Sequence, residues 1–363
     1  MKIKIAENIQ NLIPYPPGKP LEELERELGI TGSIKLASNE NALGPSPKAV
    51  AAISAALQKL HLYPDGSSHY LTQRLAEKLG VRPEQIVFGN GSNEIIGLLL
   101  TTFMARGEEV VTSHPTFLVY QKKVQARGGV NKVVPLKDMK HDLDGMLAAV
   151  TDKTRVIFLD NPNNPTGTVF TKEEFDGFLR QVPDGIIVVL DEAYVDFVDP
   201  AVRLDSRQYL GGDKPFVALR TFSKAYGLAG LRVGYGIMQA EIADYLHRVR
   251  QPFNINLLAQ IGALAAIDDD DHYQKTIQMT ADGMAWLFGE LEKLGCRTFH
   301  SETNFFLVEV GKGKDIYERL LKKGVIVRPM DAYGYPDYIR ITVGLPVENQ
   351  RFIKELAVIL KER

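Results

Sequence analysis

The segment at residues 186–194 reads IIVVLDEAY, an apolar run followed at once by two carboxylates and a phenol. A run that is apolar at every position is typical of a strand covered on both faces. Residues 156–159, VIFL, form a second such run. Further β-rich runs alternate with helical stretches, the runs at 86–88, 109–111, 132–134, 216–219 and 233–237 and the stretches at 94–104, 116–127 and 172–181. This order predicts an α/β fold with a mostly parallel, seven-stranded sheet flanked by helices.

The pattern changes after about residue 250, where the alternation of strands and helices stops. One long helical region at 257–294 precedes candidate strands at 305–310, 325–328 and 338–343. We interpret this part as a smaller α+β domain. The expected division is a large domain at residues 31–250, and an N-terminal arm (1–30) that joins the small C-terminal domain (251–363).

The N-terminal stretch at residues 14–20, PYPPGKP, is too rich in proline for a helix or an inner strand. We interpret it as an arm lying on another surface, with a disordered lead-in as the alternative.

Composition excludes several classes of function. The net charge of the 363 residues is -2, so nothing indicates a surface for nucleic acid or for anionic membranes. No apolar stretch approaches the length of a membrane span or resembles a signal peptide. Cys296 is the single cysteine, which excludes an internal disulfide and is compatible with the reducing cytoplasm, where we expect the protein. The histidines are scattered, and the acidic run at 268–271 is better explained as a helix end or turn than as a metal site.

Polar groups follow four of the predicted strands. Ligands of open parallel sheets bind beyond the carboxyl ends of the strands. The four segments found there are GNGSNE at 89–94, DNPNNPTG at 160–167, DEAY at 191–194 and RTFSKAYG at 220–227. They deliver an anion-binding loop, an amide loop, a carboxylate with a phenol, and a lysine with a hydroxyl. Together they predict a ligand site at this edge of the sheet.

Each of these features taken alone also has a simpler interpretation. The glycine loop at 89–91 suits a phosphate at a helix N-terminus, but it is equally a turn with an N-cap. Asp191 is either the counter-charge to a protonated ring nitrogen or a helix N-cap. Asn164 either holds a ring hydroxyl or forms a turn with the proline after it.

Lys224 is a candidate nucleophile, although most lysines simply lie on the surface. Glycines at 227 and 230 allow the backbone to bring Arg232 close to it. A neighbouring cation and partial burial would both lower the pKa of this lysine from about 10.4 and make the amine nucleophilic.

These motifs carry a family resemblance that covers nearly the whole chain. Residues 221–234, TFSKAYGLAGLRVG, are similar to the lysine signature of class II aminotransferases, which are pyridoxal-phosphate enzymes of fold type I. NPTG at 164–167 and DEAY at 191–194 resemble two further motifs of the family, in the expected order. Within the family the chain is similar to the histidinol-phosphate aminotransferases, through SNEN at 38–41, GPSP at 44–47, YPD at 63–65, VRP at 327–329 and YIRITVG at 338–344. Ala42 stands where proline is usual, and we expect no consequence for the chemistry.

The resemblance implies a role for each matching residue. Lys224 would bind pyridoxal phosphate as a Schiff base and move protons, while Asp191 pairs with the pyridinium nitrogen. Tyr194 and Asn164 would hold the ring hydroxyl, and Phe117 would stack on the ring. The residues implied for the cofactor phosphate are Gly91, Ser92, Asn93, Ser223 and Arg232. Tyr63 would reach the phosphate of the neighbouring subunit's cofactor, so the resemblance implies a homodimer.

Arg328 and Arg340 are the candidates for the anionic groups of the substrates, because a planar guanidinium suits carboxylate and phosphate. The alternatives are an exposed side chain at a strand end for Arg328 and a structural ion pair for Arg340. Tyr15 on the arm and Asn39 are also assigned to the substrate. The implied reaction converts L-histidinol phosphate and 2-oxoglutarate to imidazole-acetol phosphate and L-glutamate, a step of histidine biosynthesis.

Two kinds of alternative remain at this point. An aromatic amino-acid aminotransferase or a threonine-phosphate decarboxylase would use the same scaffold and the same arginines. A catalytically inactive homologue acting as a binding module is the second kind. Such proteins usually lose the lysine or the ring-nitrogen carboxylate, whereas Lys224 and Asp191 are both present.

Overall fold

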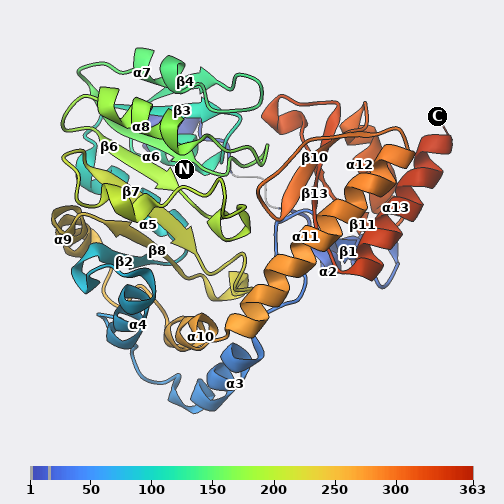
Figure 1. Ribbon diagram of the computed structural model, residues 1–363, viewed down its shortest axis with the longest axis horizontal. Helices are drawn as coiled ribbons and strands as arrows, with labels where there is room; N and C mark the ends of the chain where they lie inside the picture. Colours follow the sequence, from blue (N-terminus) through green and yellow to red (C-terminus); the bar gives the residue numbers. More distant parts are fainter. Residues whose placement is uncertain (1–2, 15–17, 363) are drawn as a thin grey trace.

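A seven-stranded sheet forms the core of the part on the left of Figure 1. The computed structural model describes residues 3–14 and 18–362. The strand order is β2-β8-β7-β6-β5-β3-β4, with β8 antiparallel to both of its neighbours and the other pairs parallel. The strands are β2 (Ile86–Gly89), β3 (Glu109–His114), β4 (Val130–Pro135), β5 (Thr154–Asp160), β6 (Ile187–Asp191), β7 (Phe216–Thr221) and β8 (Gly234–Met238). The predicted α/β fold with a mostly parallel sheet of seven strands is confirmed.

Helices cover both faces of this sheet, which explains the apolar strands. In β6, Ile187 and Val189 lie in the core on one face, and Val188 and Leu190 lie in the core on the other. The helices on the first face are α5 (Ser92–Phe103), α6 (Val119–Ala126) and α9 (Ala240–Val249). The second face packs against α4 (His69–Leu79), α7 (Leu143–Ala148), α8 (Lys172–Gln181) and α10 (Leu257–Ile267), with α3 (Pro47–Ala56) beside α10.

A four-stranded antiparallel sheet lies in the part on the right of Figure 1, in the order β12-β13-β10-β9. Its strands are β9 (Arg297–Thr298), β10 (Phe305–Glu309), β12 (Arg328–Pro329) and β13 (Tyr338–Thr342), and its helices are α11 (Asp270–Lys293), α12 (Gly313–Lys322) and α13 (Pro346–Lys361). No helix of the described residues is both long and apolar enough to cross a membrane.

A short parallel pair ties an early segment of the chain to this second part. β1 (Ile34–Lys35) pairs with β11 (Val325–Ile326), and α2 (Leu21–Leu28) packs its Leu24 against Ile326. The single strand predicted at 325–328 is therefore divided between β11 and β12, which belong to different sheets. The division of the chain into domains at residues 30 and 250 stays a prediction.

The helical region predicted at 257–294 is two helices rather than one. α10 ends at Ile267 and α11 begins at Asp270, with Asp268 as the C-cap of the first helix and Asp269 as the N-cap of the second. Asp268 forms an ion pair with Arg74 at 2.7 Å, and Asp269 accepts a hydrogen bond from the Ser46 hydroxyl at 2.5 Å. Short polar side chains that bond elsewhere compete with helix formation, so the acidic run marks a helix boundary.

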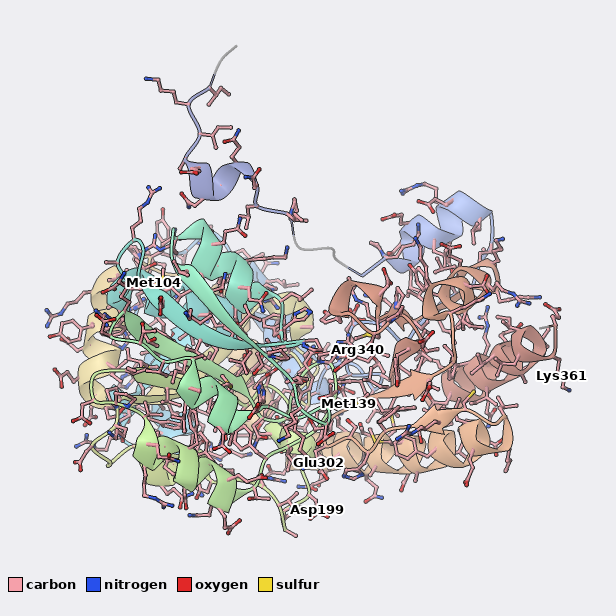
Figure 2. All side chains as sticks on the ribbon, turned by 90° about the horizontal axis from the view of Figure 1, so that it is seen from above. Met104, Met139, Asp199, Glu302, Arg340 and Lys361 are labelled. Atoms are coloured by element: carbon pink, nitrogen blue, oxygen red, sulfur yellow. The ribbon has the colours of Figure 1, made fainter. Side chains whose placement is uncertain are left out.

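Two residues of the described N-terminal segment, Asn8 and Ile13, bind α6. The Asn8 amide, in α1 (Glu7–Gln10), donates to the carbonyls of Gln125 at 3.1 Å and Ala126 at 2.9 Å. Lys122 Nζ donates to the carbonyl of Ile13 at 2.5 Å. Figure 2 shows α1 lying outside the larger part. The described portion of the predicted arm is therefore fixed to the helix that follows Phe117.

Candidate active site

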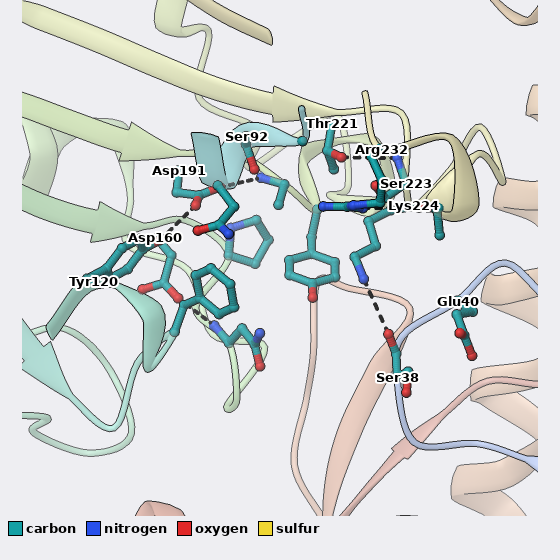
Figure 3. A pocket seen from close by; sticks show the side chains of 18 residues that line it. Ser38, Glu40, Ser92, Tyr120, Asp160, Asp191, Thr221, Ser223, Lys224 and Arg232 are labelled. Carbon is teal, nitrogen blue, oxygen red and sulfur yellow. Dashed lines mark hydrogen bonds between the residues drawn. The ribbon is translucent and has the colours of Figure 1, made fainter. Parts of the chain in front are cut away.

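A cleft of about 230 Å³ lies at the carboxyl ends of β2, β5, β6 and β7. Because these strands are parallel, their ends meet at one edge of the sheet. Figure 3 shows Ser92, Asp160, Asp191 and Lys224, one from each strand end, around this space. The full lining is Ser38, Glu40, Gly91, Ser92, Asn93, Phe117, Tyr120, Asp160, Pro162, Asn164, Asp191, Ala193, Tyr194, Thr221, Ser223, Lys224, Ala229 and Arg232.

Lys224 follows β7 and directs its amine into the cleft. Nζ donates to the carbonyl oxygens of Asn39 at 3.1 Å and Ser38 at 3.3 Å. Loss of hydration lowers the pKa of Lys224 to about 8, with Arg340 contributing more than Arg232 among the neighbouring cations. The sequence indicated Arg232 as the cation responsible. The structure shows that Arg340, more than a hundred residues further along the chain, has the larger effect.

Asp191 ends β6 with only 4% of its surface exposed. The Tyr120 hydroxyl donates to its Oδ2 at 2.7 Å, and the N–H of Ala193 donates to its Oδ1 at 3.1 Å. Burial raises the pKa of Asp191 to about 7; the Tyr120 hydrogen bond opposes the rise, and the charge of Asp160 adds to it. Neither donor carries a charge. A cation bound in the cleft would therefore meet a buried carboxylate that lacks a full counter-charge.

The alternative role of Asp191 as a helix N-cap is not adopted. The 3-10 turn that follows, Val195–Phe197, is capped at Tyr194.

The loop after β2 offers its backbone N–H groups at the start of α5. Gly91 is the N-cap of α5 with a φ of +73°. A Cβ at this position would lie 2.4 Å from Arg232 Nη2, so only glycine allows the guanidinium to approach the loop this closely. Ser92, Asn93 and Ser223 line the same cleft. The positive end of a twelve-residue helix and an arginine thus converge where a phosphate would be stabilised.

Three predicted ring-binding residues, Tyr194, Asn164 and Phe117, line the cleft. The Tyr194 hydroxyl accepts a hydrogen bond from Asn39 Nδ2 at 2.8 Å. The backbone N–H of Asn164 donates to Asp160 Oδ2 at 2.9 Å. The rings of Phe117 and Tyr120 form a T-shaped pair, with centroids 5.4 Å apart.

The two predicted arginines are cross-strand partners, Arg328 on β12 and Arg340 on β13. Arg340 is buried and donates from Nη1 to Asn164 Oδ1 at 2.5 Å and from Nη2 to the Ala37 carbonyl at 3.0 Å. Figure 2 places Arg340 at the boundary between the two parts. Residues directly opposite in an antiparallel pair have side chains on one face of the sheet, so Arg328 lies on the face that reaches Asn164.

Of the predicted residues that the structure describes, four do not line the cleft: Arg328, Arg340, Asn39 and Tyr63. Asn39 lies beside it through its bond to Tyr194. Tyr63 is 83% exposed and stacks on Phe253 at 4.9 Å, away from the cleft lining of its own chain. Tyr15 lies outside the described residues. Nearby, Gly18 lies against Ser38 of the cleft, since a Cβ on it would be 2.8 Å from Ser38 Oγ.

Among the cleft residues that the sequence did not indicate are Tyr120 and Asp160, and a histidine behind them, His141, was also missed. Asp160 could have been found, because it ends a fully apolar strand as Asp191 does. Tyr120 and His141 had no local signal. Their partners lie 71 and 19 residues away in the sequence.

Comparison with known proteins matches residues 31–356 to the family described as aminotransferase class I and II. A histidinol-phosphate aminotransferase of Desulfotalea psychrophila is 57% identical over 366 aligned positions, covering 100% of this chain and 97% of the relative. One of Moorella thermoacetica is 47% identical, with 98% and 93% covered.

A solved structure is similar along the whole chain. It is the histidinol-phosphate aminotransferase of Sinorhizobium meliloti in complex with pyridoxal-5'-phosphate, with a TM-score of 0.91 and 29% identity. The alignment covers 100% of this chain and 99% of that one.

Proposed function

Because this chain belongs to the class I and II aminotransferase family, we propose that it transfers the amino group of L-histidinol phosphate to 2-oxoglutarate. The products would be imidazole-acetol phosphate and L-glutamate, and the step would serve histidine biosynthesis in the cytoplasm. The enzyme is a pyridoxal-phosphate-dependent transaminase. The main support for this proposal is a cleft lined by both Lys224 and Asp191, in a chain that is similar over its whole length to a histidinol-phosphate aminotransferase.

Two features of the cleft fit pyridoxal phosphate. Asp191 is buried and has only neutral donors, which suits a pyridinium nitrogen. The close approach of Gly91 and Arg232 at the start of α5 suits the phosphate. When bound, the cofactor supplies an electron sink that allows the Cα–H bond of the substrate to break.

We propose further contacts to the cofactor ring and to its phosphate. Phe117 would cover the ring face, and Asn164 with Tyr194 would hold the ring hydroxyl. Ser92, Asn93 and Ser223 line the cleft with Gly91 and are assigned to the phosphate.

Lys224 is proposed to carry the cofactor and to move the proton. With a pKa of about 8, a useful fraction of its amine is neutral near physiological pH. Nζ can therefore accept a proton from the substrate Cα and return it later. The carbonyls of Ser38 and Asn39 accept hydrogen bonds from the amine and would stabilise its protonated form between the two transfers.

Arg340 and Arg328 are proposed to bind the anionic groups of the two substrates. 2-Oxoglutarate brings two carboxylates, whereas histidinol phosphate brings a phosphate and no carboxylate. Two arginines on one face of the sheet can bind both substrates, because a guanidinium forms paired hydrogen bonds to a carboxylate or to a phosphate. Asn39 would contact the substrate from beside Lys224. The position of Gly18 against Ser38 brings the arm close to the cleft and supports the assignment of Tyr15 to the substrate phosphate.

A homodimer is proposed as the active unit, with Tyr63 reaching the partner's cofactor phosphate. The segment around Tyr63 is unusually apolar for a surface. Its exposed fractions are 83% for Tyr63, 76% for Tyr70, 58% for Leu60 and 57% for Leu62. Apolar patches of this kind mark association surfaces, and a second copy of the chain is the partner we propose.

Steady-state comparison of three amines tests the proposed reaction. With 2-oxoglutarate present, kcat/KM for histidinol phosphate should exceed that for phenylalanine by about tenfold or more, because the phenylalanine ring brings no phosphate to the arginines. Faster turnover of phenylalanine would indicate the aromatic enzyme instead. Release of carbon dioxide from threonine phosphate without a keto acid would indicate the decarboxylase. Lys224→Ala protein is the control for turnover that does not depend on the lysine.

A further inference from the structure

A second buried carboxylate lies beside Asp191, and the proposed reaction gives it no role. Asp160 is the last residue of β5 and is directly opposite Asp191 in the parallel pair of β5 and β6. It is 4% exposed and lines the cleft. Placing two carboxylates side by side in the interior is costly, so a structural reason for Asp160 is needed.

The two oxygens of Asp160 bind two different loops. Oδ1 accepts a hydrogen bond from the Thr116 hydroxyl at 2.6 Å, and Thr116 directly precedes Phe117. Oδ2 accepts the backbone N–H of Asn164 at 2.9 Å. The loop after β3 and the loop after β5 are thereby tied to one carboxylate. The first loop carries the residue proposed for the ring face, and the second carries the residue proposed for the ring hydroxyl.

His141 fixes the same carboxylate from behind. It is 8% exposed, and its Nε2 lies 2.9 Å from Asp160 Oδ1 and 3.0 Å from the Asp160 carbonyl. Its Nδ1 lies 2.7 Å from the hydroxyl of Ser113, which is on β3. The imidazole therefore spans the ends of β3 and β5 and restricts the rotation of the Asp160 side chain. Asn163 Nδ2 adds a third contact to Oδ1 at 3.0 Å.

We propose that Asp160 and His141 are positioning residues, which hold Phe117 and Asn164 in register so that the cofactor ring is bound at its face and its hydroxyl at once. This inference rests on the proposed function. In this proposal Asp160 does not donate a proton to the substrate or cofactor, because both of its oxygens accept hydrogen bonds from the groups named above. Its role is to convert two separate loops into one rigid wall opposite Lys224.

Cofactor binding by the apoprotein tests the proposal without relying on turnover. Asp160→Asn replaces an oxygen acceptor by a donor and should raise the dissociation constant for pyridoxal phosphate roughly ten- to a hundred-fold. At saturating cofactor, the visible circular dichroism per bound molecule should fall by about half or more, because the ring is no longer held in one orientation. Asp269→Asn is the matched control, another buried and hydrogen-bonded aspartate, which does not line the cleft.

Two milder variants keep the test decisive if Asp160→Asn does not fold. Thr116→Val has nearly the same shape but removes the link to the β3 loop, and should weaken cofactor binding about three- to ten-fold. His141→Gln retains an amide nitrogen near the position of Nε2 and should bind the cofactor better than His141→Ala.

The outcomes separate the inference from the proposed function. If Asp160→Asn and Thr116→Val bind the cofactor within twofold of the parent, with unchanged visible circular dichroism, the inference is wrong. The same holds if the variants only lower the melting temperature equally with and without cofactor, which is the effect of a purely structural role. If the parent binds the cofactor but does not transaminate histidinol phosphate, the proposed substrate fails while the positioning role is still measured. A parent that does not bind pyridoxal phosphate would overturn both.

Discussion

Replacing Tyr120 by phenylalanine removes one hydroxyl next to the proposed cofactor site. Tyr120 is fully buried and stacks on Phe158 with ring centroids 4.8 Å apart, and its hydroxyl donates to Asp191 at 2.7 Å. Phenylalanine keeps the ring and its packing, so the variant should fold. Among the described contacts, Asp191 then keeps the N–H of Ala193 as its donor.

The effect on Asp191 can be worked out from this contact. A hydrogen bond to a charged group contributes about 1.5–3 kcal/mol, which corresponds to roughly 1–2 pKa units. The pKa of Asp191 is about 7 in the parent and would rise to roughly 8–9 in the variant. At pH 7.5 the ionised fraction would fall from about three quarters to between roughly a quarter and a thirtieth.

Titration of the two apoproteins with pyridoxal phosphate measures this change. If the ring nitrogen pairs with the ionised carboxylate, the dissociation constant of Tyr120→Phe should be about three- to twenty-five-fold higher at pH 7.5. At pH 9.5 both carboxyls are largely ionised, so the two constants should agree within about 1.5-fold. Tyr245→Phe, at an exposed tyrosine that does not line the cleft, is the control. Equal affinities at pH 7.5, or a loss that persists at pH 9.5, would refute the pairing of Asp191 with the ring.

Three further predictions follow from the same structure. The pKa of Lys224 in the folded protein is about 8, below the usual 10.5, so the neutral fraction of the amine increases from pH 7 to pH 9.5. The rate at which the cofactor attaches should therefore rise about tenfold over this range. A rate that does not change with pH would contradict Lys224 as the attachment site. Gly167→Ala places a Cβ 2.0 Å from Ser301 Oγ and should lower the free energy of unfolding in urea by about 3 kcal/mol. Gly185→Ala is the control, because Gly185 has a similar φ but no atom near the added Cβ, and it should lose about 1 kcal/mol. Equal losses would exclude a steric clash with Ser301. Mixing equal amounts of Tyr63→Ala chains and Lys224→Ala chains should restore about a quarter of the native activity. About half of the dimers would be mixed, and one of the two sites in each mixed dimer would have both native residues. No recovery of activity would contradict a site shared between subunits.

The sequence was most informative where one strand end determines a position. Fully apolar strands predict a sheet covered on both faces, and parallel strands must bring their carboxyl ends to one edge. The convergence of Asp191 and Lys224 therefore followed from strand order, without knowledge of side-chain contacts. The glycine loop before Ser92 was interpretable for the same reason.

The sequence was least informative where distant segments meet. β1 pairs with β11 from the other end of the chain, and no local pattern indicates that partner. The pKa of Lys224 depends more on Arg340 than on the nearer Arg232 for the same reason. The sequence predicted one helical region at 257–294, although the acidic run at 268–271 was itself interpreted as a helix end or turn. Contacts of Asp268 and Asp269 with Arg74 and Ser46, which are distant in the sequence, fix the boundary between α10 and α11 there.

Borohydride reduction followed by peptide mapping tests the central claim, that Lys224 carries the cofactor opposite Asp191. The purified holoprotein should be yellow, lose its visible absorbance on reduction, and yield one modified peptide per chain with the pyridoxyl group on Lys224. The Lys224→Ala protein should yield none. Modification of a different lysine in the parent, or an unchanged reducible linkage in Lys224→Ala, would contradict the assignment of the cofactor to Lys224.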